Sequence, residues 1–329
     1  MYNSMIIIDH LSYSYDRTEA LSIENLSIEK GVTTIFLGSN GSGKTTLLKI
    51  LSGLLNPSKG SINRDSVNLK KNAILVHQIP YLFSGTVGYN IDFVLKIKKL
   101  SIDNRKKIIK DSLEQAGIFH LYRRKTSQLS GGEKHRLAIA RALAMEPEIL
   151  VLDEPFAHID VESRILIEHI LEKRANSGKT TVLSTHDLAL AYRLADRIIY
   201  LENGKIKEQE FNFLKGFISK RDEHFCSFLA GTAKEKVTIL APVSDGNYKV
   251  AVIPYSDIIL SKDRIESSAQ NQLSGEITGF RKSGSQYFIT VNCGVEITAI
   301  ITDRSASKFQ LEEKKKIFVN FKASAVRLY

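Results

Sequence analysis

The residues with the clearest chemistry form a glycine-rich run near the start of the chain. Gly38, Gly41 and Gly43 allow the backbone to curl, so that its N–H groups point at phosphate oxygens. The lysine that follows such a run contacts the β- and γ-phosphates of a nucleotide, and the next hydroxyl binds Mg²⁺. The residues predicted to bind the nucleotide here are Gly38, Ser39, Asn40, Gly41, Ser42, Gly43, Lys44, Thr45 and Thr46, of which Thr45 is also the metal ligand.

Two adjacent carboxylates follow an apolar run further along the chain. Asp153 and Glu154 come directly after Ile149–Leu152, which has the length and character of a buried strand. Asp153 is predicted to orient Mg²⁺, because hard cations prefer oxygen ligands. Glu154 is predicted to be the general base that polarises an attacking water molecule. Together with the glycine-rich run, this pair indicates hydrolysis of a nucleoside triphosphate.

A third motif, Leu129-Ser130-Gly131-Gly132-Glu133, stands between the other two and opens a predicted helix over Glu133–Ala144. N–H groups at a helix start and a serine hydroxyl stabilise a phosphate anion. The order of the three motifs resembles the ATP-binding-cassette (ABC) ATPases. The resemblance implies that ATP and Mg²⁺ are the cofactors and that the chain forms a head-to-tail homodimer. In such a dimer Ser130, Gly131 and Gly132 contact the ATP bound by the other subunit.

The same resemblance assigns four further residues. Gln78 resembles the glutamine that contacts Mg²⁺ or water and senses the membrane partner, and His186 resembles the histidine that holds the γ-phosphate and the catalytic water. Asp160 occupies the D-loop position, although Ala157-His158-Ile159 precedes it where this family more often has Ser-Ala-Leu. Tyr15, 29 residues before Lys44, suits the aromatic ring that stacks on adenine. The expected catalytic residues are thus Glu154, His186 and Gln78, and the expected metal ligands are Thr45, Gln78 and Asp153.

These residues need a sheet and helices to position them. Strand-like Thr33–Leu37 runs into the glycine-rich loop and a helix from Lys44, and further strands are predicted at Ile149–Leu152 and Thr181–Ser184. The alternation of strands and helices predicts an α/β domain with a mostly parallel sheet over residues 1–230. A helical subdomain is predicted to be inserted at about 80–145.

Short, β-branched strands and turn residues dominate the end of the chain. A linking segment is predicted at Phe225–Lys236, and residues 231–265 are predicted to form a connector and the first strands of a regulatory region. Residues 266–329 are predicted to form a small all-β, OB-like barrel. The segments Ser267–Ile277 and Lys322–Val326 resemble the molybdate-binding Mop domain. Hydroxyl and N–H groups with a cation suit a tetrahedral dianion, and the candidate oxyanion ligands are Ser268, Asn271, Lys322 and Ser324. Gln270 stands where arginine is common, which removes a possible positive charge.

Composition narrows the class of protein. The net charge of +10 comes from scattered residues, so no nucleic-acid partner is predicted. No secretory signal is read at the N-terminus, and no apolar run approaches the ~20 residues of a membrane-spanning helix. Two cysteines, Cys226 and Cys293, show no metal-ligand spacing and fit a reducing compartment.

The leading interpretation is the ATP-hydrolysing subunit of an ABC importer for molybdate or tungstate. The protein would lie at the cytoplasmic face of the membrane, bind separate permease subunits and serve an extracytoplasmic binding protein indirectly. Oxyanion bound to the C-terminal domain would inhibit it. The alternative is an importer ATPase for sulfate, sugar or polyamine with a purely structural β-barrel tail. An oxyanion storage or sensing protein and an ABC protein acting on DNA or the ribosome are the interpretations from other classes.

Overall fold

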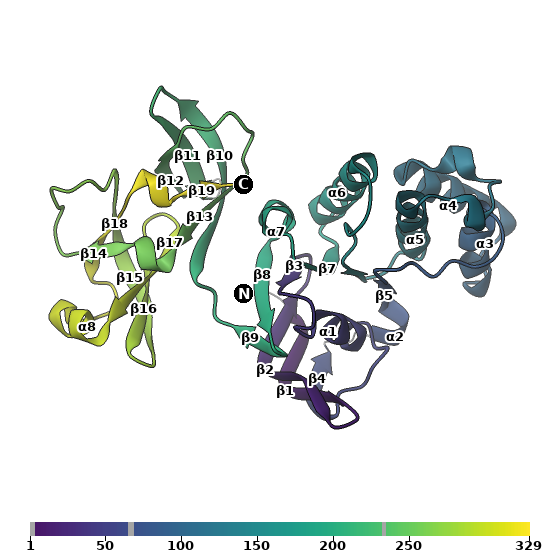
Figure 1. Ribbon diagram of the computed structural model, residues 1–329, viewed down its shortest axis with the longest axis horizontal. Coiled ribbons are helices and arrows are strands. Elements are labelled where there is room, and N and C mark those ends of the chain that lie inside the picture. The colour runs from purple at the N-terminus through teal and green to yellow at the C-terminus, as the bar shows by residue number, and fades with distance from the viewer. Residues whose placement is uncertain (1–3, 65–68, 232–234) are drawn as a thin grey trace. The chain divides into compact units, whose positions relative to one another are not determined.

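The computed structural model describes residues 4–64, 69–231 and 235–329. The chain divides into two compact units, Met1–Glu208 and Gln209–Tyr329 (Figure 1). Each unit has its own sheets and its own hydrophobic core.

The first unit is built on a six-stranded sheet and a three-stranded sheet. In the larger sheet five strands are parallel and the last is antiparallel, in the order β5 (Ala73–Val76), β6 (Ile149–Asp153), β7 (Thr180–Thr185), β3 (Thr33–Leu37), β8 (Arg197–Glu202) and β9 (Lys205–Lys207). The smaller sheet is antiparallel, in the order β2 (Thr18–Glu29), β1 (Ser4–Tyr15) and β4 (Lys59–Arg64). Because β6 and β7 lie side by side in parallel, the residues that follow them meet at one edge.

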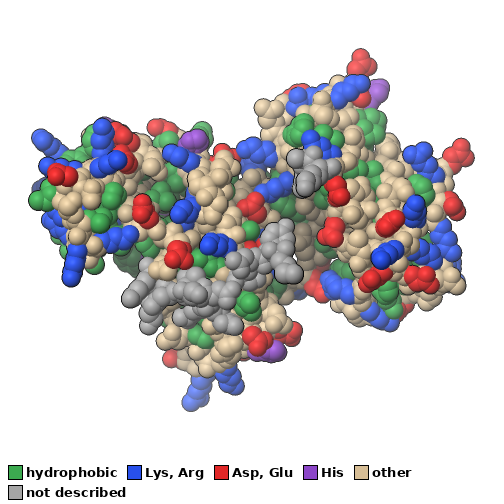
Figure 2. Space-filling view, turned by 180° about the vertical axis from the view of Figure 1, so that it is seen from behind, with side chains coloured by type: hydrophobic (Ala, Val, Ile, Leu, Met, Phe, Trp, Pro, Cys, Tyr) green, Lys and Arg blue, Asp and Glu red, His purple; other side chains and the backbone are tan. Residues whose placement is uncertain are grey.

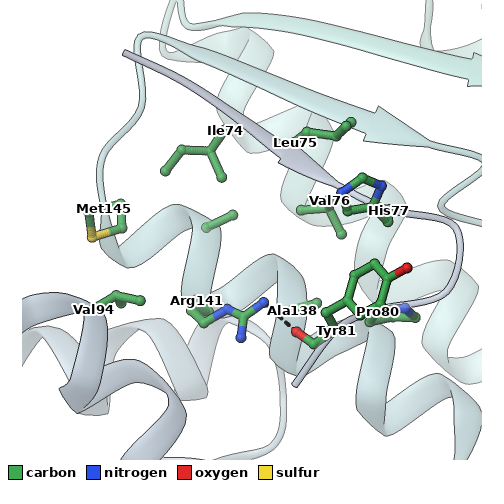
Figure 3. A pocket seen from close by; sticks show the side chains of 11 residues that line it. Ile74, Leu75, Val76, His77, Pro80, Tyr81, Val94, Ala138, Arg141 and Met145 are labelled. Carbon is green, nitrogen blue, oxygen red and sulfur yellow. Dashed lines mark hydrogen bonds between the residues drawn. The ribbon is translucent and has the colours of Figure 1, made fainter. Parts of the chain in front are cut away.

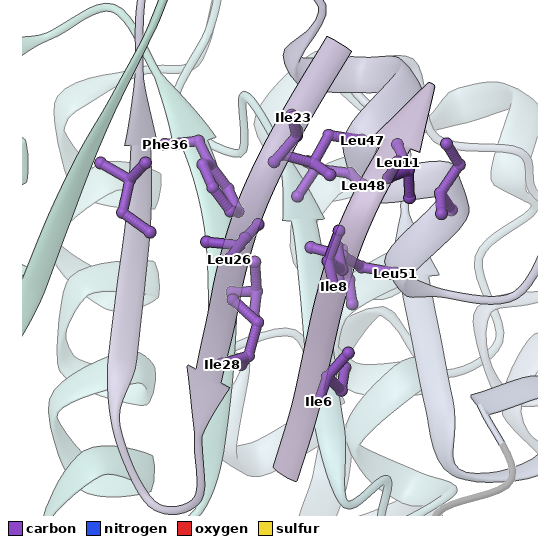
Figure 4. Close-up of a cluster of buried hydrophobic side chains, with 14 of the residues drawn as sticks. Ile6, Ile8, Leu11, Ile23, Leu26, Ile28, Phe36, Leu47, Leu48 and Leu51 are labelled. Atoms are coloured by element: carbon purple, nitrogen blue, oxygen red, sulfur yellow. The ribbon is translucent and has the colours of Figure 1, made fainter. Parts of the chain in front are cut away.

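Apolar residues of both sheets enclose the helix that follows the glycine-rich loop. This helix, α1 (Lys44–Leu51), buries three of its leucines completely among β1, β2 and the larger sheet (Figure 4). The alternating burial along β2 places one face of the small sheet on α1, as a half-buried strand requires. The side chains in this core include Ile6, Ile8, Leu11, Ile23, Leu26, Ile28, Phe36, Leu47, Leu48 and Leu51.

The predicted helical subdomain is present as three helices with a core of their own. They are α3 (Val87–Ile97), α4 (Ile102–Gln115) and α5 (Gly131–Ala144). The short helix α2 (Leu69–Asn72) precedes β5, and α6 (Val161–Asn176) and α7 (Leu188–Leu194) flank β7 in the sequence. Brief 3-10 turns at Phe119–Leu121 and Thr126–Gln128 lead from α4 into α5.

The second unit contains two five-stranded antiparallel sheets around one core. The first has the order β12 (Lys236–Pro242), β11 (Phe225–Gly231), β10 (Phe211–Arg221), β13 (Val250–Pro254) and β19 (Arg327–Leu328). The second has the order β14 (Ile259–Ser261), β18 (Lys316–Phe321), β15 (Asn271–Ser283), β16 (Gln286–Asn292) and β17 (Glu296–Thr302), with α8 (Asp303–Phe309) after β17.

This arrangement differs from the predicted boundaries in three respects. The predicted first domain ended at 230, but β10 and β11 pair with each other and with strands of the second unit, so the division falls at Glu208/Gln209. The segment Phe225–Lys236, predicted to be a linker, contains all of β11 and the start of β12. Because β19 pairs with β13, residues 266–329 also share a sheet with the residues before them.

Two surface properties bear on the function. On the face shown in Figure 2, Lys and Arg side chains are interspersed with Asp and Glu side chains, as scattered charge in the sequence suggests. Among the helices of the described residues, none is both long and apolar enough to span a bilayer.

Candidate nucleotide-binding site

The glycine-rich loop joins β3 to α1 and requires glycine at its last position. Gly43 has φ +101°, and a Cβ there would lie 2.7 Å from Leu21 Cδ2 and 2.9 Å from Ala20 O. Lys44, the first residue of α1, curls back so that its Nζ donates to Gly38 O at 2.7 Å and to Ser39 O at 3.0 Å. The lysine charge is therefore held directly over the loop whose N–H groups suit phosphate oxygens.

Thr45 and Asp153 meet although they come from α1 and β6. Thr45 Oγ1 donates to Asp153 Oδ2 at 2.8 Å, and Ser184 Oγ donates to Asp153 Oδ1 at 2.7 Å. Hydroxyl and carboxylate oxygens at one point are the donor set that Mg²⁺ prefers, so these residues fit the ion. Sequence reasoning missed Ser184, whose signal is a small polar residue within the fully buried strand β7.

Glu154 lies between a histidine and the loop lysine. Its Oε2 is 3.1 Å from His186 Nδ1, and its Oε1 is 3.7 Å from Lys44 Nζ. The residue adopts φ +46°, and its N–H donates to Ser184 Oγ at 3.0 Å. Among the described residues, Glu154 Oε1 is buried without a hydrogen-bond partner. A buried carboxylate oxygen without a donor is costly, so it is suited to accept a hydrogen bond from water or another molecule.

Tyr15 ends β1 beside the helix that carries the loop. Its hydroxyl lies 3.4 Å from Thr46 Oγ1, and its ring meets that of Tyr13 edge-on at 5.0 Å between centroids. The Tyr15 side chain is 45% exposed, so an aromatic surface is available next to the glycine-rich loop. Ser39, Asn40 and Gly41 are exposed, whereas Ser42 is buried.

The Ser-Gly-Gly motif begins α5, with Ser130 as its N-cap and Gly131 as its first residue, so the helix starts two residues before the predicted Glu133. Ser130 Oγ accepts from Glu133 N at 3.2 Å, and Glu133 Oε2 accepts from Ser130 N at 2.7 Å, which is a complete capping box. Ser130 and Gly131 are exposed, although the Ser130 N–H is engaged by Glu133 in the capping box. In the described part of the chain, no hydrogen bond links Ser130, Gly131 or Gly132 to the glycine-rich loop.

Gly132 and Asp160 are in close contact, which joins α5 to the start of α6. A Cβ on Gly132 would lie 2.3 Å from Asp160 Oδ2 and 2.3 Å from Ser163 Oγ. Asp160 caps α6 and accepts from the Ser163 N–H at 2.7 Å and from its hydroxyl at 2.9 Å. These two hydrogen bonds lower the pKa of the Asp160 carboxyl, so it is ionised at neutral pH.

Gln78 lies in the irregular segment between β5 and α3. Its side chain is exposed, and its carbonyl oxygen is 2.8 Å from His135 Nε2 of α5. The neighbouring His77 has a lowered pKa because of burial and the charge of Lys49, with Asp153 opposing the shift. The segment therefore starts close to the edge of the sheet that carries Asp153.

In the second unit, the two segments predicted to bind an oxyanion meet. Gln270 Oε1 accepts from Ala323 N at 2.9 Å, which places the residues around Ser268 beside those around Lys322 and Ser324. Ser268, Lys322 and Ser324 are exposed. Asn271 differs, because it is 3% exposed and its amide bonds Leu240 N at 2.7 Å and Leu240 O at 2.9 Å. These bonds give Asn271 a structural role that joins β15 to β12.

Comparison with known families agrees with this geometry. The ABC transporter family model matches residues 21–157, and the TOBE domain model matches residues 267–328. A molybdate/tungstate import ATP-binding protein of Pyrococcus abyssi is 33% identical over 99% of this chain and 100% of its own length. The chain therefore belongs to the ABC transporter ATP-binding proteins and carries a C-terminal TOBE domain. It is the transport-coupled ATPase subunit of an importer.

One further relative and one solved structure are also similar to this chain. A sulfate/thiosulfate import ATP-binding protein of Mesostigma viride is 32% identical, over 80% of this chain and 81% of its own length. A dimeric ATP-binding cassette in a post-hydrolysis state, bound to ADP and Pi, is a solved structure with TM-score 0.58 and 31% identity. The match covers 63% of this chain and 98% of that one.

Proposed function

We propose that the residues gathered around Glu154 hydrolyse ATP and that each has a distinct task. Lys44 and the loop N–H groups bind the phosphates, Tyr15 stacks on adenine, and Glu154 takes a proton from the attacking water. His186 orients that carboxylate through the 3.1 Å contact. The observation that supports this assignment is Glu154 Oε1, which is buried, lies 3.7 Å from Lys44 Nζ and accepts no hydrogen bond from the described residues.

Mg²⁺ fits the oxygen atoms of Thr45 and Asp153, with Gln78 as a further ligand. When bound, the ion would neutralise charge on the phosphates. Ser184 fixes the Asp153 carboxylate from the opposite side, so that one orientation of the carboxylate is favoured. Lys44 contributes a second positive charge next to the same phosphates.

The active form is proposed to be a head-to-tail homodimer. Ser130, Gly131 and Gly132 are exposed or packed on Asp160 and make no hydrogen bond to the loop of their own chain among the described residues. The exposed start of α5, at Ser130 and Gly131, is suited to phosphate bound by a second copy. The cassette of similar fold described above is a dimer with ADP and Pi.

The cargo is proposed to be molybdate or tungstate. The supporting observation is the similarity over the whole of both chains, TOBE domain included, to a protein named for import of these anions. The adjacent segments around Ser268 and Lys322 offer hydroxyls and one cation for a tetrahedral dianion. Binding there would provide feedback inhibition of the ATPase. The chain would act at the cytoplasmic face of the membrane on separate permease subunits.

Calorimetric titration of the intact chain with molybdate, tungstate and sulfate tests the cargo. The intact chain is needed because a fragment that starts after β13 would lack the strand that pairs with β19. Micromolar binding of molybdate and tungstate but not of sulfate is expected. Preferential binding of sulfate would instead support the sulfate alternative, for which a similar relative exists. Absence of binding would leave the TOBE domain with a structural role.

Two lysine variants provide a matched comparison for this titration. Lys322→Met removes the cation beside the Gln270–Ala323 contact, and we expect it to weaken molybdate binding at least tenfold. Lys308→Met removes the same charge from the exposed face of α8 and should leave binding unchanged. Equal losses in both variants would mean that net charge rather than this position governs affinity.

A further inference from the structure

A histidine on the helix that begins with the Ser-Gly-Gly motif contacts the main chain at two proposed nucleotide-site residues. His135 is 7% exposed, and its Nε2 is 2.8 Å from Gln78 O. Its Nδ1 is 3.1 Å from Gly131 O. One imidazole ring thus bridges the first turn of α5 and the residue proposed to contact Mg²⁺ or water.

The segment that carries Gln78 depends on side chains for its position. Residues 77–85 lie between β5 and α3 without helix or strand structure, so their carbonyl groups need other partners. Arg141 Nη2 donates to Tyr81 O at 2.6 Å, a contact drawn in Figure 3 beside a cavity of about 190 Å³. Asn90 bonds both Phe83 N, at 2.8 Å, and Phe83 O, at 3.0 Å. His135 fixes the segment at Gln78 itself, and Arg141 and Asn90 fix it further along.

In the hydrogen bond between His135 and Gln78, the ring nitrogen is the donor and the carbonyl oxygen is the acceptor. Carbonyl oxygens only accept hydrogen bonds, so the bond to Gln78 requires a proton on His135 Nε2. The distance of 2.8 Å at Nε2 is the shorter of the two and suits an N–H donor. A bond to the carbonyl of Gln78 restrains the peptide plane from which the exposed side chain of the same residue projects.

We propose that His135 is a positioning residue for Gln78. It holds the main chain of Gln78 in register with the start of α5, so that the side-chain amide of Gln78 remains within reach of the nucleotide site. Because the same ring also faces Gly131 O, a shift of the first turn of α5 is transmitted to Gln78. The inference rests on the proposed function of Gln78 and adds to it the residue that sets its position.

The test compares side chains of equal length with and without a donor. His135→Gln retains an N–H that can reach Gln78 O, whereas His135→Met does not. In the full chain with ATP and Mg²⁺, we expect H135M to lower kcat at least tenfold with KM for ATP changed less than twofold. H135Q should keep at least half of the wild-type kcat. His135→Leu, which also lacks a donor and is apolar like Met, should behave like H135M and provides a second donor-free variant if H135M does not fold.

A double-mutant cycle with Gln78→Ala separates positioning from loss of stability. If His135 acts through Gln78, then either donor-free change should lower kcat no further in the Q78A background. Thr126→Val removes a hydroxyl that contacts two carbonyl oxygens of the same segment, Gly85 O and Phe83 O, and Asn90 remains bonded to Phe83 O. This variant controls for general loosening and should keep the wild-type kcat.

The outcomes distinguish a failure of the proposed function of Gln78 from a failure of the positioning role of His135. If Q78A alone keeps the wild-type kcat, the proposed function of Gln78 is wrong. If Q78A lowers kcat but the donor-free variants of His135 do not, the positioning role is overturned while the function of Gln78 stands. Additive losses in the double mutant would also overturn the positioning role, since they would show that His135 acts independently of Gln78.

Discussion

Glu154 Oε2 lies 3.1 Å from His186 Nδ1, although the two residues follow different strands of the sheet. β6 and β7 are adjacent and parallel, so the residues just beyond their carboxyl ends are brought together. Glu154 is buried, whereas the His186 side chain is 63% exposed. The histidine side chain is therefore accessible from solvent, whereas the carboxylate that it contacts is enclosed.

The first prediction concerns the carboxylate of this pair. Glu154→Gln keeps the size of the side chain but removes the base, so we expect kcat for ATP hydrolysis to fall by about 10²–10⁴-fold. ATP affinity should change little, because Lys44 and the loop N–H groups remain. Steady-state hydrolysis and equilibrium binding of ATP, measured on the same preparation, check both parts. Hydrolysis within a few-fold of wild type would show that another group is the base.

The second prediction concerns the contact between α5 and α6. Gly132→Ala places a Cβ about 2.3 Å from two oxygen atoms, Asp160 Oδ2 and Ser163 Oγ, so helix and cap must shift. Overpacking of this kind costs about 1–3 kcal/mol, which a denaturant titration can measure. Gly131→Ala is the matched control for stability, since the nearest atom to its Cβ is His158 O at 3.8 Å. Equal stability of the two variants would contradict the packing argument.

Much of the site could be predicted from sequence because its residues follow strand ends or begin helices. Lys44, Asp153 and His186 are placed by the parallel sheet that their flanking apolar runs predict. Ser184 and His135 were missed because their importance lies in contacts to residues 30 and 57 positions away, respectively. Such distances become contacts only once the strand order and the packing of α5 are known.

The boundary between the two units could not be predicted from the sequence. The residues of Phe211–Arg221 and Phe225–Gly231 do not indicate which sheet these two strands join. Their partners are β13 and β12, and the two last strand residues, Arg327–Leu328, return to β13 from the far end of the chain. Long-range antiparallel pairing is set by packing of the shared core, which a local pattern does not contain.

The third prediction tests the structural role found for Asn271. Asn271→Leu removes the side-chain amide that bonds the N–H and the carbonyl oxygen of Leu240 in β12. Both of these backbone groups then lose the partner that Asn271 provides. We expect the free energy of unfolding of the second unit to fall by about 1–3 kcal/mol. The Asp257→Ala change, at an exposed residue of the same unit, should have little effect. Unchanged stability of N271L, together with a loss of molybdate binding, would return Asn271 to the role of an anion ligand.

The fourth prediction follows from the partial burial of Cys293. Burial raises the pKa of its thiol from 9.0 to about 12, because the thiolate is poorly solvated there. Only the thiolate is an effective nucleophile, so iodoacetamide at pH 8 should label Cys293 much more slowly in the folded protein than in denaturant. Peptide mass spectrometry measures the two rates at this cysteine. Equal rates would show that the thiol is not buried in solution.

The same shift in pKa predicts how stability depends on pH. In the unfolded chain the Cys293 thiol loses its proton near pH 9, whereas in the folded protein it keeps the proton until about pH 12. The unfolded state therefore binds fewer protons between these values, and the free energy of unfolding falls as the pH rises through this window. Lysine and tyrosine titrate in the same range, so the comparison that isolates Cys293 is with Cys293→Ala. The difference in stability between wild type and C293A should be constant below pH 8 and should change in favour of C293A above pH 9.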